Sequence, residues 1–309
     1  MRELYERLAG EVGKVVVGQE NVVRGVATGL AVGGHVLLEG PPGVAKTLLA
    51  SAVARSLGLD FRRVQFTPDM LPSDLTGTST LRAGQLEFRP GPVFANLLLA
   101  DEINRTPPKT QSALLEAMQE RQVSVEGRPR PLPDPFLVVA TQNPIEYEGT
   151  YPLPEAQLDR FLVKLDVGYP SADEELGMLA LRRNGVGIGP LDTVEPVAGA
   201  ERLRDARALV DATAVTEDIG RYVVSVVRRT RELPSVSLGA SPRAAVHLLG
   251  AAKAAARLAG REFVTPDDVT RMAPPVLAHR LVMTPEAELE GYRGDAAVRT
   301  VLTEVPVPR

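Results

Sequence analysis

The chain has 309 residues, enough for two domains of ordinary size, and 44% of them are hydrophobic, which excludes global disorder. Lysine and arginine number 35 against 39 aspartates and glutamates, and the net charge of −4 argues against a general nucleic-acid coat. Cysteine is absent and the three histidines lie far apart, so we expect neither disulfides, thiol nucleophiles nor a multi-histidine metal site.

We expect neither a membrane span nor an export signal. The longest stretch without a formal charge is residues 25–38, whose 14 residues are too few to cross a bilayer. The first seven residues are charged from the start and lack an apolar signal core. These features predict a soluble cytoplasmic protein.

Residues 1–183 alternate short apolar runs with helical patterns, which is typical of an α/β domain with a mainly parallel sheet. The candidate strands are residues 35–38, 63–66, 96–100 and 136–140. Most are apolar on both faces, as a sheet covered on both sides requires. Helical spacing predicts helices over residues 47–57 and 109–121.

A change of pattern divides the chain. Residues 184–200 include four glycines and two prolines and predict a linker. The pattern beyond is wholly helical, with one helix over residues 217–231. Ser241-Pro242 opens a second helix and Thr265-Pro266 a third, because serine or threonine followed by proline favours a helix start. We therefore expect a core over residues 1–183 and a small all-helical domain over residues 201–309.

A phosphate-binding loop follows the first strand and opens a helix. Its residues are Gly40, Pro41, Pro42, Gly43, Val44, Ala45, Lys46 and Thr47, with Leu48 next in the helix. The glycines let backbone N–H groups turn toward phosphate oxygens, and the helix dipole adds positive potential. Lys46 would reach the β and γ phosphates and Thr47 would bind Mg²⁺. A Gly-Pro turn beside a surface lysine is the alternative, which the strand–loop–helix context disfavours.

Ala45 departs from the usual pattern, which has a glycine at that place. A methyl group there leads us to expect an ordinary backbone conformation, with the loop already entering the helix.

Two carboxylates end the third apolar run. Asp101 and Glu102 follow it directly, and the carboxyl ends of parallel strands meet at the edge that holds the phosphate loop. Adjacent strand residues point in opposite directions, so we expect Asp101 to face Mg²⁺ and Glu102 to face the attacking water as general base. A strand ending in acids is common by chance, but together with the phosphate loop the signal is strong.

Three further polar residues are candidates for work on a phosphate. Asn143 follows the fourth strand and would bond the γ-phosphate or orient the water, unless it is a turn asparagine. Arg160 would stabilise the negative charge of the transition state, on the nucleotide of its own subunit or of a neighbour. The alternative is that it only forms a surface ion pair with Asp159 or Glu155. Arg243 lies in the first turn of a helix, where the dipole disfavours a cation and an external anion would compensate.

Together these motifs resemble those of the AAA+ ATPases. Three blocks resemble the MoxR branch in particular: residues 99–109 with their continuation through 111–120, residues 140–144 and residues 155–161. The likeness covers nearly the whole chain, and the alanine at position 45 fits this branch. It implies a P-loop NTPase fold, with a three-layer αβα core, a mainly parallel sheet and a small all-α lid domain. It further implies a ring, usually hexameric, with ATP at the subunit interfaces.

The resemblance also implies residue roles. Arg160 would be the arginine finger on the neighbouring subunit, Asn143 sensor 1, and Arg243 sensor 2, acting in its own or the adjacent site. Residues 17–19, with Gly18 and Gln19, resemble the segment that contacts adenine. Residues 80–93 and 122–135 resemble two hairpins that line or flank the ring pore.

Three functions remain open. The first is a Mg²⁺-dependent ATPase motor that remodels a client protein; MoxR relatives work with von Willebrand A-type domain proteins in maturation or metal insertion. The second is a DNA-engaging ring contacted through Arg128 and Arg130, against which stand the negative net charge and the scarcity of aromatics for stacking. The third is an ATP-held scaffold that hydrolyses rarely.

Overall fold

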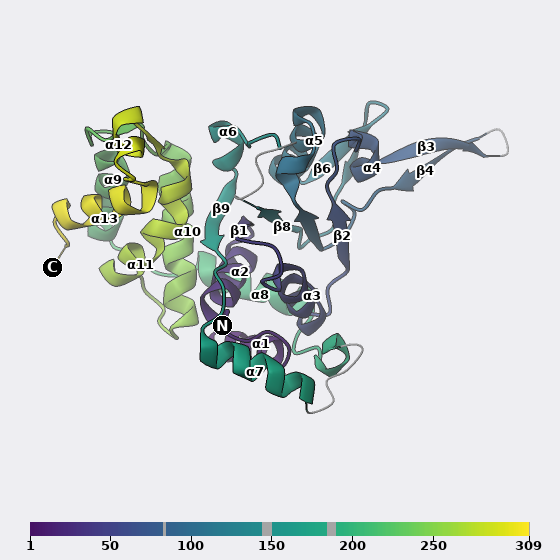
Figure 1. The fold of residues 1–309 in the computed structure, drawn as a ribbon, viewed down its shortest axis with the longest axis horizontal. Coiled ribbons are helices and arrows are strands. Elements are labelled where there is room, and N and C mark those ends of the chain that lie inside the picture. The colour runs from purple at the N-terminus through teal and green to yellow at the C-terminus, as the bar shows by residue number, and fades with distance from the viewer. Residues whose placement is uncertain (83–84, 144–149, 184–189, 309) are drawn as a thin grey trace.

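A five-stranded sheet forms the centre of the core in the computed structural model, which describes residues 1–82, 85–143, 150–183 and 190–308 (Figure 1). Its strands are β1 (His35–Glu39), β2 (Phe61–Gln65), β5 (Leu97–Asp101), β8 (Leu137–Gln142) and β9 (Phe161–Asp166). They run in the order β2-β5-β8-β1-β9, and every neighbouring pair is parallel. Four of these strands match the sequence prediction within a few residues.

The fifth strand, β9, was not predicted. It lies at the edge of the sheet beside β1, where Lys164 and Asp166 interrupt the apolar run that begins at Phe161. An edge strand is covered only in part, so it does not need to be apolar along its whole length.

Helices cover both faces of the sheet. Helices α1 (Arg2–Gly13), α2 (Glu20–Val32) and α3 (Lys46–Ser56) pack with one face, to which Val36 and Leu38 of β1 belong. Helix α5 (Pro108–Glu120) packs on the other face, with Leu37 between these two residues. This alternation along one strand creates two apolar cores and gives the expected three-layer αβα arrangement.

Two hairpins leave the core on the side of α5. Strands β3 (Gly77–Arg82) and β4 (Gln85–Pro90) form a long antiparallel pair that projects from the body in Figure 1. Strands β6 (Gln122–Val125) and β7 (Arg128–Pro131) form the second pair, after α5. The second pair falls within the predicted segment 122–135, whereas the first overlaps the predicted segment 80–93 but begins three residues earlier, at Gly77. The short helix α4 (Pro72–Thr76) precedes the first.

The C-terminal part, the lid, packs beside β9 (Figure 1). Its helices are α9 (Glu217–Arg229), α10 (Pro242–Leu258), α11 (Pro266–Leu277), α12 (Pro285–Leu289) and α13 (Gly294–Glu304), with the short turn η3 (Ala278–Arg280). A small antiparallel pair, β10 (Val236–Leu238) with β11 (Val282–Met283), interrupts the helical pattern that the sequence predicts. Its five residues are too few to give a period-2 signal.

The connection between the two parts is only partly described. Helix α7 (Ala172–Arg183) follows β9, and residues 184–189 of the predicted linker, like residue 144 of the motif 140–144, lie outside the described residues. The turn η2 (Pro190–Thr193) and helix α8 (Ala200–Asp211) follow, and α8 packs against both α2 and α10. The predicted boundaries of core, linker and lid stay predictions.

Candidate nucleotide-binding site

The phosphate loop joins the carboxyl end of β1 to the start of α3. Its first residue is enclosed: a Cβ on Gly40 would lie 2.2 Å from the carbonyl oxygen of Val167, and its N–H donates to the carbonyl of Gln142 at 3.3 Å. Gly43 has a φ of +85°, which favours glycine. The side chain of Val44 is buried, which anchors the loop to the core.

Ala45 contradicts the expectation for its backbone. Its φ of 61° and ψ of 21° are left-handed, and α3 begins only at Lys46. The chain needs a left-handed residue to turn the loop into the helix, and alanine can adopt that conformation at a cost of about 1–2 kcal/mol. The prediction of an ordinary conformation was therefore wrong.

Lys46 lies folded over the loop. Its Nζ donates to the carbonyls of Gly40 at 2.6 Å and Pro41 at 3.0 Å. Partial burial lowers the pKa of Lys46, although Asp101 and Glu102 oppose the shift. The ammonium is thus already at the mouth of the loop, where a phosphate would meet it.

Thr47 and Asp101 meet as expected. The Thr47 hydroxyl donates to Asp101 Oδ2 at 3.3 Å, and Asp101 Oδ1 accepts from the Thr141 hydroxyl at 2.6 Å. The guanidinium of Arg63 also contacts Oδ2, at 2.8 Å. A hydroxyl beside a carboxylate offers the oxygen ligands that Mg²⁺ prefers, so the residues present fit that ion.

Glu102 is oriented by its own backbone rather than by strand alternation. Strand β5 ends at Asp101, and Glu102 is left-handed, with a φ of 57° and ψ of 50°. Its Oε2 accepts from Gln65 Nε2 at 2.7 Å and from Arg105 Nε at 2.9 Å. The expectation that alternation along the strand aims Glu102 was therefore wrong.

Sequence reasoning missed the side chains that hold these carboxylates: Arg63, Gln65, Arg105 and Thr141. Three of these contacts depend on which strands are neighbours, which the sequence does not show; Gln65, for example, ends β2 and is the direct neighbour of Asp101 across the sheet.

Two other predicted segments reach the same edge. Asn143 is buried and directly follows β8, which lies between β5 and β1. Gln19 is buried too, and its Nε2 donates to the carbonyl of Gly168 at 3.4 Å, just beyond β9. Gly18, before it, has a φ of +75°. Val167 is hydrogen-bonded to Glu39, at the end of β1, so residues 18 and 19 border the phosphate loop.

Arg160 and Arg243 lie at the opposite edge. Arg160 immediately precedes β9 and donates to Gln119 Oε1 at 3.0 Å, beside a hollow of about 300 Å³. Arg243, in the first turn of α10, lies 4.0 Å from a carboxylate oxygen of Asp159. At about 3.3 Å per residue, the six residues of β9 separate these arginines from the phosphate loop by roughly 17–20 Å.

The chain is similar to known proteins over most of its length. Residues 35–163 match the family model described as ATPase family associated with various cellular activities (AAA), and residues 228–301 match an AAA lid domain. Chaperone MoxR1 of Mycobacterium tuberculosis is 46% identical over 98% of this chain and 82% of its own length. Protein MoxR of Methylorubrum extorquens is 34% identical, over 99% of this chain and 96% of its own.

A solved structure agrees over the full length. The crystal structure of a protein from Cytophaga hutchinsonii, described as a candidate ATPase, superimposes with a TM-score of 0.92 at 41% identity. It covers 100% of this chain and 96% of that one. Within the described residues, none of the helices combines the length and apolar character needed to cross a membrane. The chain belongs to the MoxR family of AAA+ proteins, and it is an ATPase that converts ATP to ADP and phosphate.

Proposed function

We propose that the protein works in the cytoplasm as a ring, with a hexamer as the expected size, whose ATP sites lie between subunits. One subunit would supply the phosphate-loop edge of its sheet and the next would supply Arg160 and Arg243. The observation that carries this proposal is the separation of the two edges by the length of β9. A guanidinium at the amino edge cannot reach a γ-phosphate at the carboxyl edge of the same sheet.

Each residue at the phosphate-loop edge has a task in this proposal. Lys46 neutralises the β and γ phosphates, while Thr47 and Asp101 hold Mg²⁺, which when bound offsets the charge that develops on the phosphate oxygens. Glu102 accepts the proton of the attacking water, and Asn143 orients that water or bonds the γ-phosphate. For Glu102 this requires its carboxylate to leave Gln65 or to receive the water beside it.

Further residues would complete the nucleotide site. Pro41, Pro42, Val44, Ala45 and Leu48 complete the loop and the first turn of α3, and Gly18 with Gln19 would contact adenine. Support comes from the hydrogen bond of Gln19 to Gly168, which holds this segment against the end of β9.

The shared site is tested by mixing two inactive variants. Glu102→Gln should bind ATP without turnover, and Arg160→Ala should lose turnover while keeping nucleotide affinity much better than Lys46→Ala. In a mixed ring, an Arg160→Ala subunit receives the intact arginine of a Glu102→Gln neighbour and can hydrolyse ATP. Phosphate release above the sum of the two separate variants is expected. Release equal to that sum would contradict a shared site.

We further infer a chaperone-like role, in which ATP turnover remodels a partner protein such as one with a von Willebrand A-type domain. The relative named chaperone MoxR1 supports this role. The test is the ATPase rate with and without a purified candidate of that domain class. A partner that binds the Glu102→Gln form with ATP and raises wild-type turnover supports the role, and a partner that does neither is excluded.

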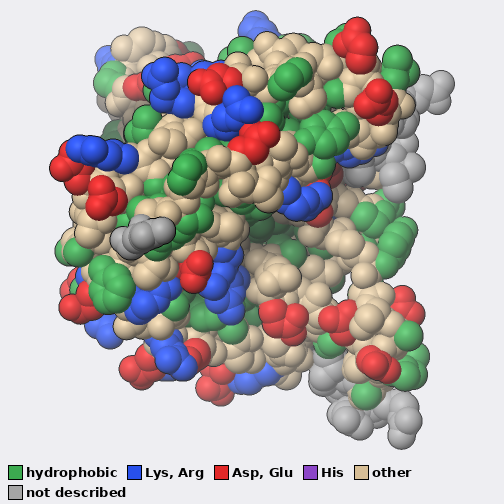
Figure 2. Space-filling model, turned by 90° about the vertical axis from the view of Figure 1, so that its left-hand side faces the viewer, with side chains coloured by type: hydrophobic (Ala, Val, Ile, Leu, Met, Phe, Trp, Pro, Cys, Tyr) green, Lys and Arg blue, Asp and Glu red, His purple; other side chains and the backbone are tan. Residues whose placement is uncertain are grey.

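The DNA-engaging alternative finds less support. The guanidinium of Arg130 lies over the ring of Phe88 at 3.8 Å, so this arginine already has a partner within the hairpins. Figure 2 shows positive and negative side chains intermixed over the side on which the lid lies. Binding to single- or double-stranded DNA that weakens with salt would revive this alternative.

A further inference from the structure

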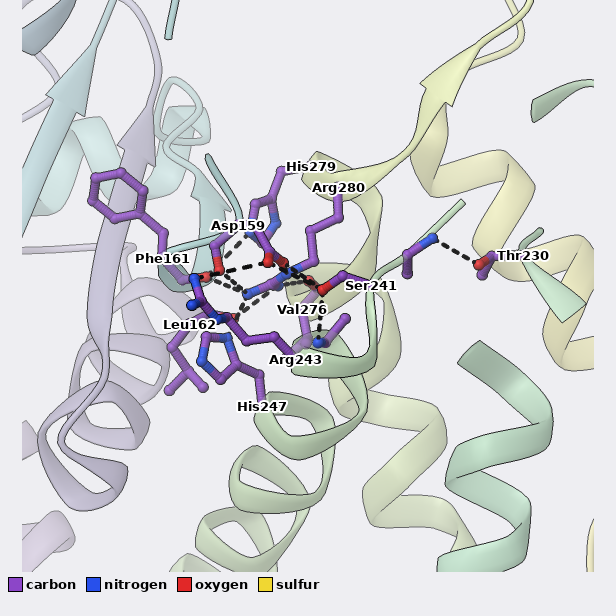
Figure 3. Close-up of polar contacts among 12 residues, drawn as sticks. Asp159, Phe161, Leu162, Thr230, Ser241, Arg243, His247, Val276, His279 and Arg280 are labelled. Carbon is purple, nitrogen blue, oxygen red and sulfur yellow. Dashed lines mark hydrogen bonds and ion pairs between the residues drawn. The ribbon is translucent and has the colours of Figure 1, made fainter. Parts of the chain in front are cut away.

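A cluster of charged side chains ties the lid to the core just before β9. Asp159 lies between the short helix α6 (Glu155–Leu158) and Arg160. Its carboxylate accepts from Arg280 Nε at 2.8 Å and from the hydroxyl of Ser241, which lies 3.1 and 3.0 Å from its two oxygens. Arg243 approaches the same carboxylate (Figure 3). Asp159 is therefore held by three side chains of the lid.

Arg280 is the centre of this cluster and is buried, at 4% exposure. Beyond Asp159, its guanidinium donates to the carbonyls of Phe161 at 2.5 Å, Leu162 at 3.4 Å and Val276. The first two belong to β9 and the third to α11, so one side chain connects the edge strand with the lid. Figure 3 shows it between the two parts.

The protonation states fit this arrangement. Burial lowers the pKa of Arg280 to about 10, so the guanidinium keeps its charge at neutral pH. Burial also lowers the pKa of His247 to about 4, so the imidazole is neutral there. Its Nδ1 lies 2.5 Å from a guanidinium nitrogen and accepts a hydrogen bond from it.

Stability alone does not explain this ion pair, in which Arg280 is buried and Asp159 is partly exposed, because apolar side chains of similar volume are often as favourable at a buried position. Such pairs can instead fix one geometry among several. Here the fixed geometry includes two arginines, since Arg160 is the next residue after Asp159 and Arg243 touches the same carboxylate.

We propose that the Asp159–Arg280 pair positions Arg160 and Arg243 as one unit with the lid, so that the lid of one subunit sets the arginines that serve the next subunit's ATP. This inference rests on the proposed shared site. In this proposal Asp159 and Arg280 are positioning residues, which act on the nucleotide through Arg160 and Arg243. Their loss should impair turnover in the adjacent site and leave the variant's own pocket intact.

Asp159→Asn and Arg280→Gln test the pair. Because a displacement of about 1 Å at a reacting group can cost a hundredfold in rate, we expect kcat to fall about tenfold to a hundredfold. The KM for ATP and the affinity for ADP, measured by calorimetry, should stay within about threefold, since Lys46 and its loop lie at the other edge. Arg280→Lys keeps the buried charge but cannot contact Asp159 and Phe161 together, and it serves if the first variants do not fold.

Arg261→Gln is the matched control. It breaks another ion pair of the lid, in which Asp268 is fully buried and lies 2.6 Å from the guanidinium, at the start of α11 and without contact to Asp159. A general weakening of the lid would lower kcat in this variant as well. We expect its unfolding midpoint in urea to fall and its kcat, measured where it is folded, to stay within about twofold of wild type.

Mixing separates positioning from simple damage. Asp159→Asn mixed with Glu102→Gln should release phosphate above the sum of the two, because the first keeps its base and the second keeps its arginines. Asp159→Asn mixed with Arg160→Ala should not recover, since both lack a correctly placed arginine.

The outcomes distinguish the two proposals. If Arg160→Ala and Glu102→Gln complement each other but Asp159→Asn and Glu102→Gln do not, the positioning role is wrong and the shared site stands. The positioning role is also overturned if the pair variants keep kcat within threefold of wild type, or if Arg261→Gln loses as much. Failure of Arg160→Ala itself to complement would remove the shared site.

Discussion

Gly40→Ala tests how the phosphate loop depends on its fit against Val167, the residue that follows β9. A Cβ added at this position would lie 2.2 Å from the carbonyl oxygen of Val167, whereas real Cβ atoms essentially never come closer than 3.0 Å. The clashing atom belongs to the backbone of Val167, so it cannot move aside as a flexible side chain could. This backbone is itself held in place, because the N–H of Val167 donates to the carbonyl of Glu39 at 2.7 Å. The loop must therefore move by about 0.8 Å or break this hydrogen bond.

The expected cost is twofold. Overpacking of this kind destabilises by about 1–3 kcal/mol, and a shift near 1 Å lowers kcat/KM for ATP by about a hundredfold. Both are measurable, by urea unfolding and by phosphate release. Gly220→Ala, within α9, is the control: nothing lies within 4 Å of its added Cβ, so we expect a gain of about 0.5–1 kcal/mol and unchanged turnover. The steric reasoning would be refuted by a Gly40→Ala enzyme that unfolds with the same free energy as wild type and keeps its kcat/KM for ATP within threefold.

Two more predictions concern stability. Burial lowers the pKa of both His35 and His247 to about 4, so between pH 6.5 and 4 the unfolded chain takes up protons that the folded chain refuses. The free energy of unfolding should therefore decrease as the pH is lowered through this interval, by about 3 kcal/mol for His35. The decrease should be smaller in His35→Gln, and urea titrations at pH 7 and 4.5 check the sign. Ala45→Gly removes the strain of a left-handed alanine but increases the conformational entropy of the unfolded chain, so we expect the free energy of unfolding to rise by at most about 1 kcal/mol. A decrease in urea unfolding would contradict the strain.

The parts of the site that follow from local sequence were predictable. A strand, a glycine-containing loop and a helix start fix where Lys46 lies, because the three are consecutive in the chain. The rule that parallel strands end at one edge then brings Asp101 and Asn143 to the same place. The structure agrees with these positions, while the catalytic roles stay predictions.

Other parts depend on contacts between distant segments and left no local signal. Arg280 is one of many arginines in the helical region, and nothing near it in sequence indicates that Asp159 is its partner, 121 residues away. The same holds for Arg63, whose contact with Asp101 requires β2 to be the neighbour of β5. The sequence pattern also did not predict the backbone conformation of Ala45 and Glu102. Both residues are left-handed because of the turn that the surrounding loop must make.

Because β9 was not predicted, the sequence did not show whether Arg160 could contact the nucleotide of its own subunit. Once residues 161–166 are recognised as a strand parallel to β1, residue 160 must lie at the amino edge of the sheet, because it directly precedes the strand. The phosphate loop follows β1 and must lie at the carboxyl edge. No choice of strand order changes this opposition. An arginine one residue before a parallel strand therefore serves a phosphate in another subunit or serves none, and the mixing experiment decides between these two outcomes.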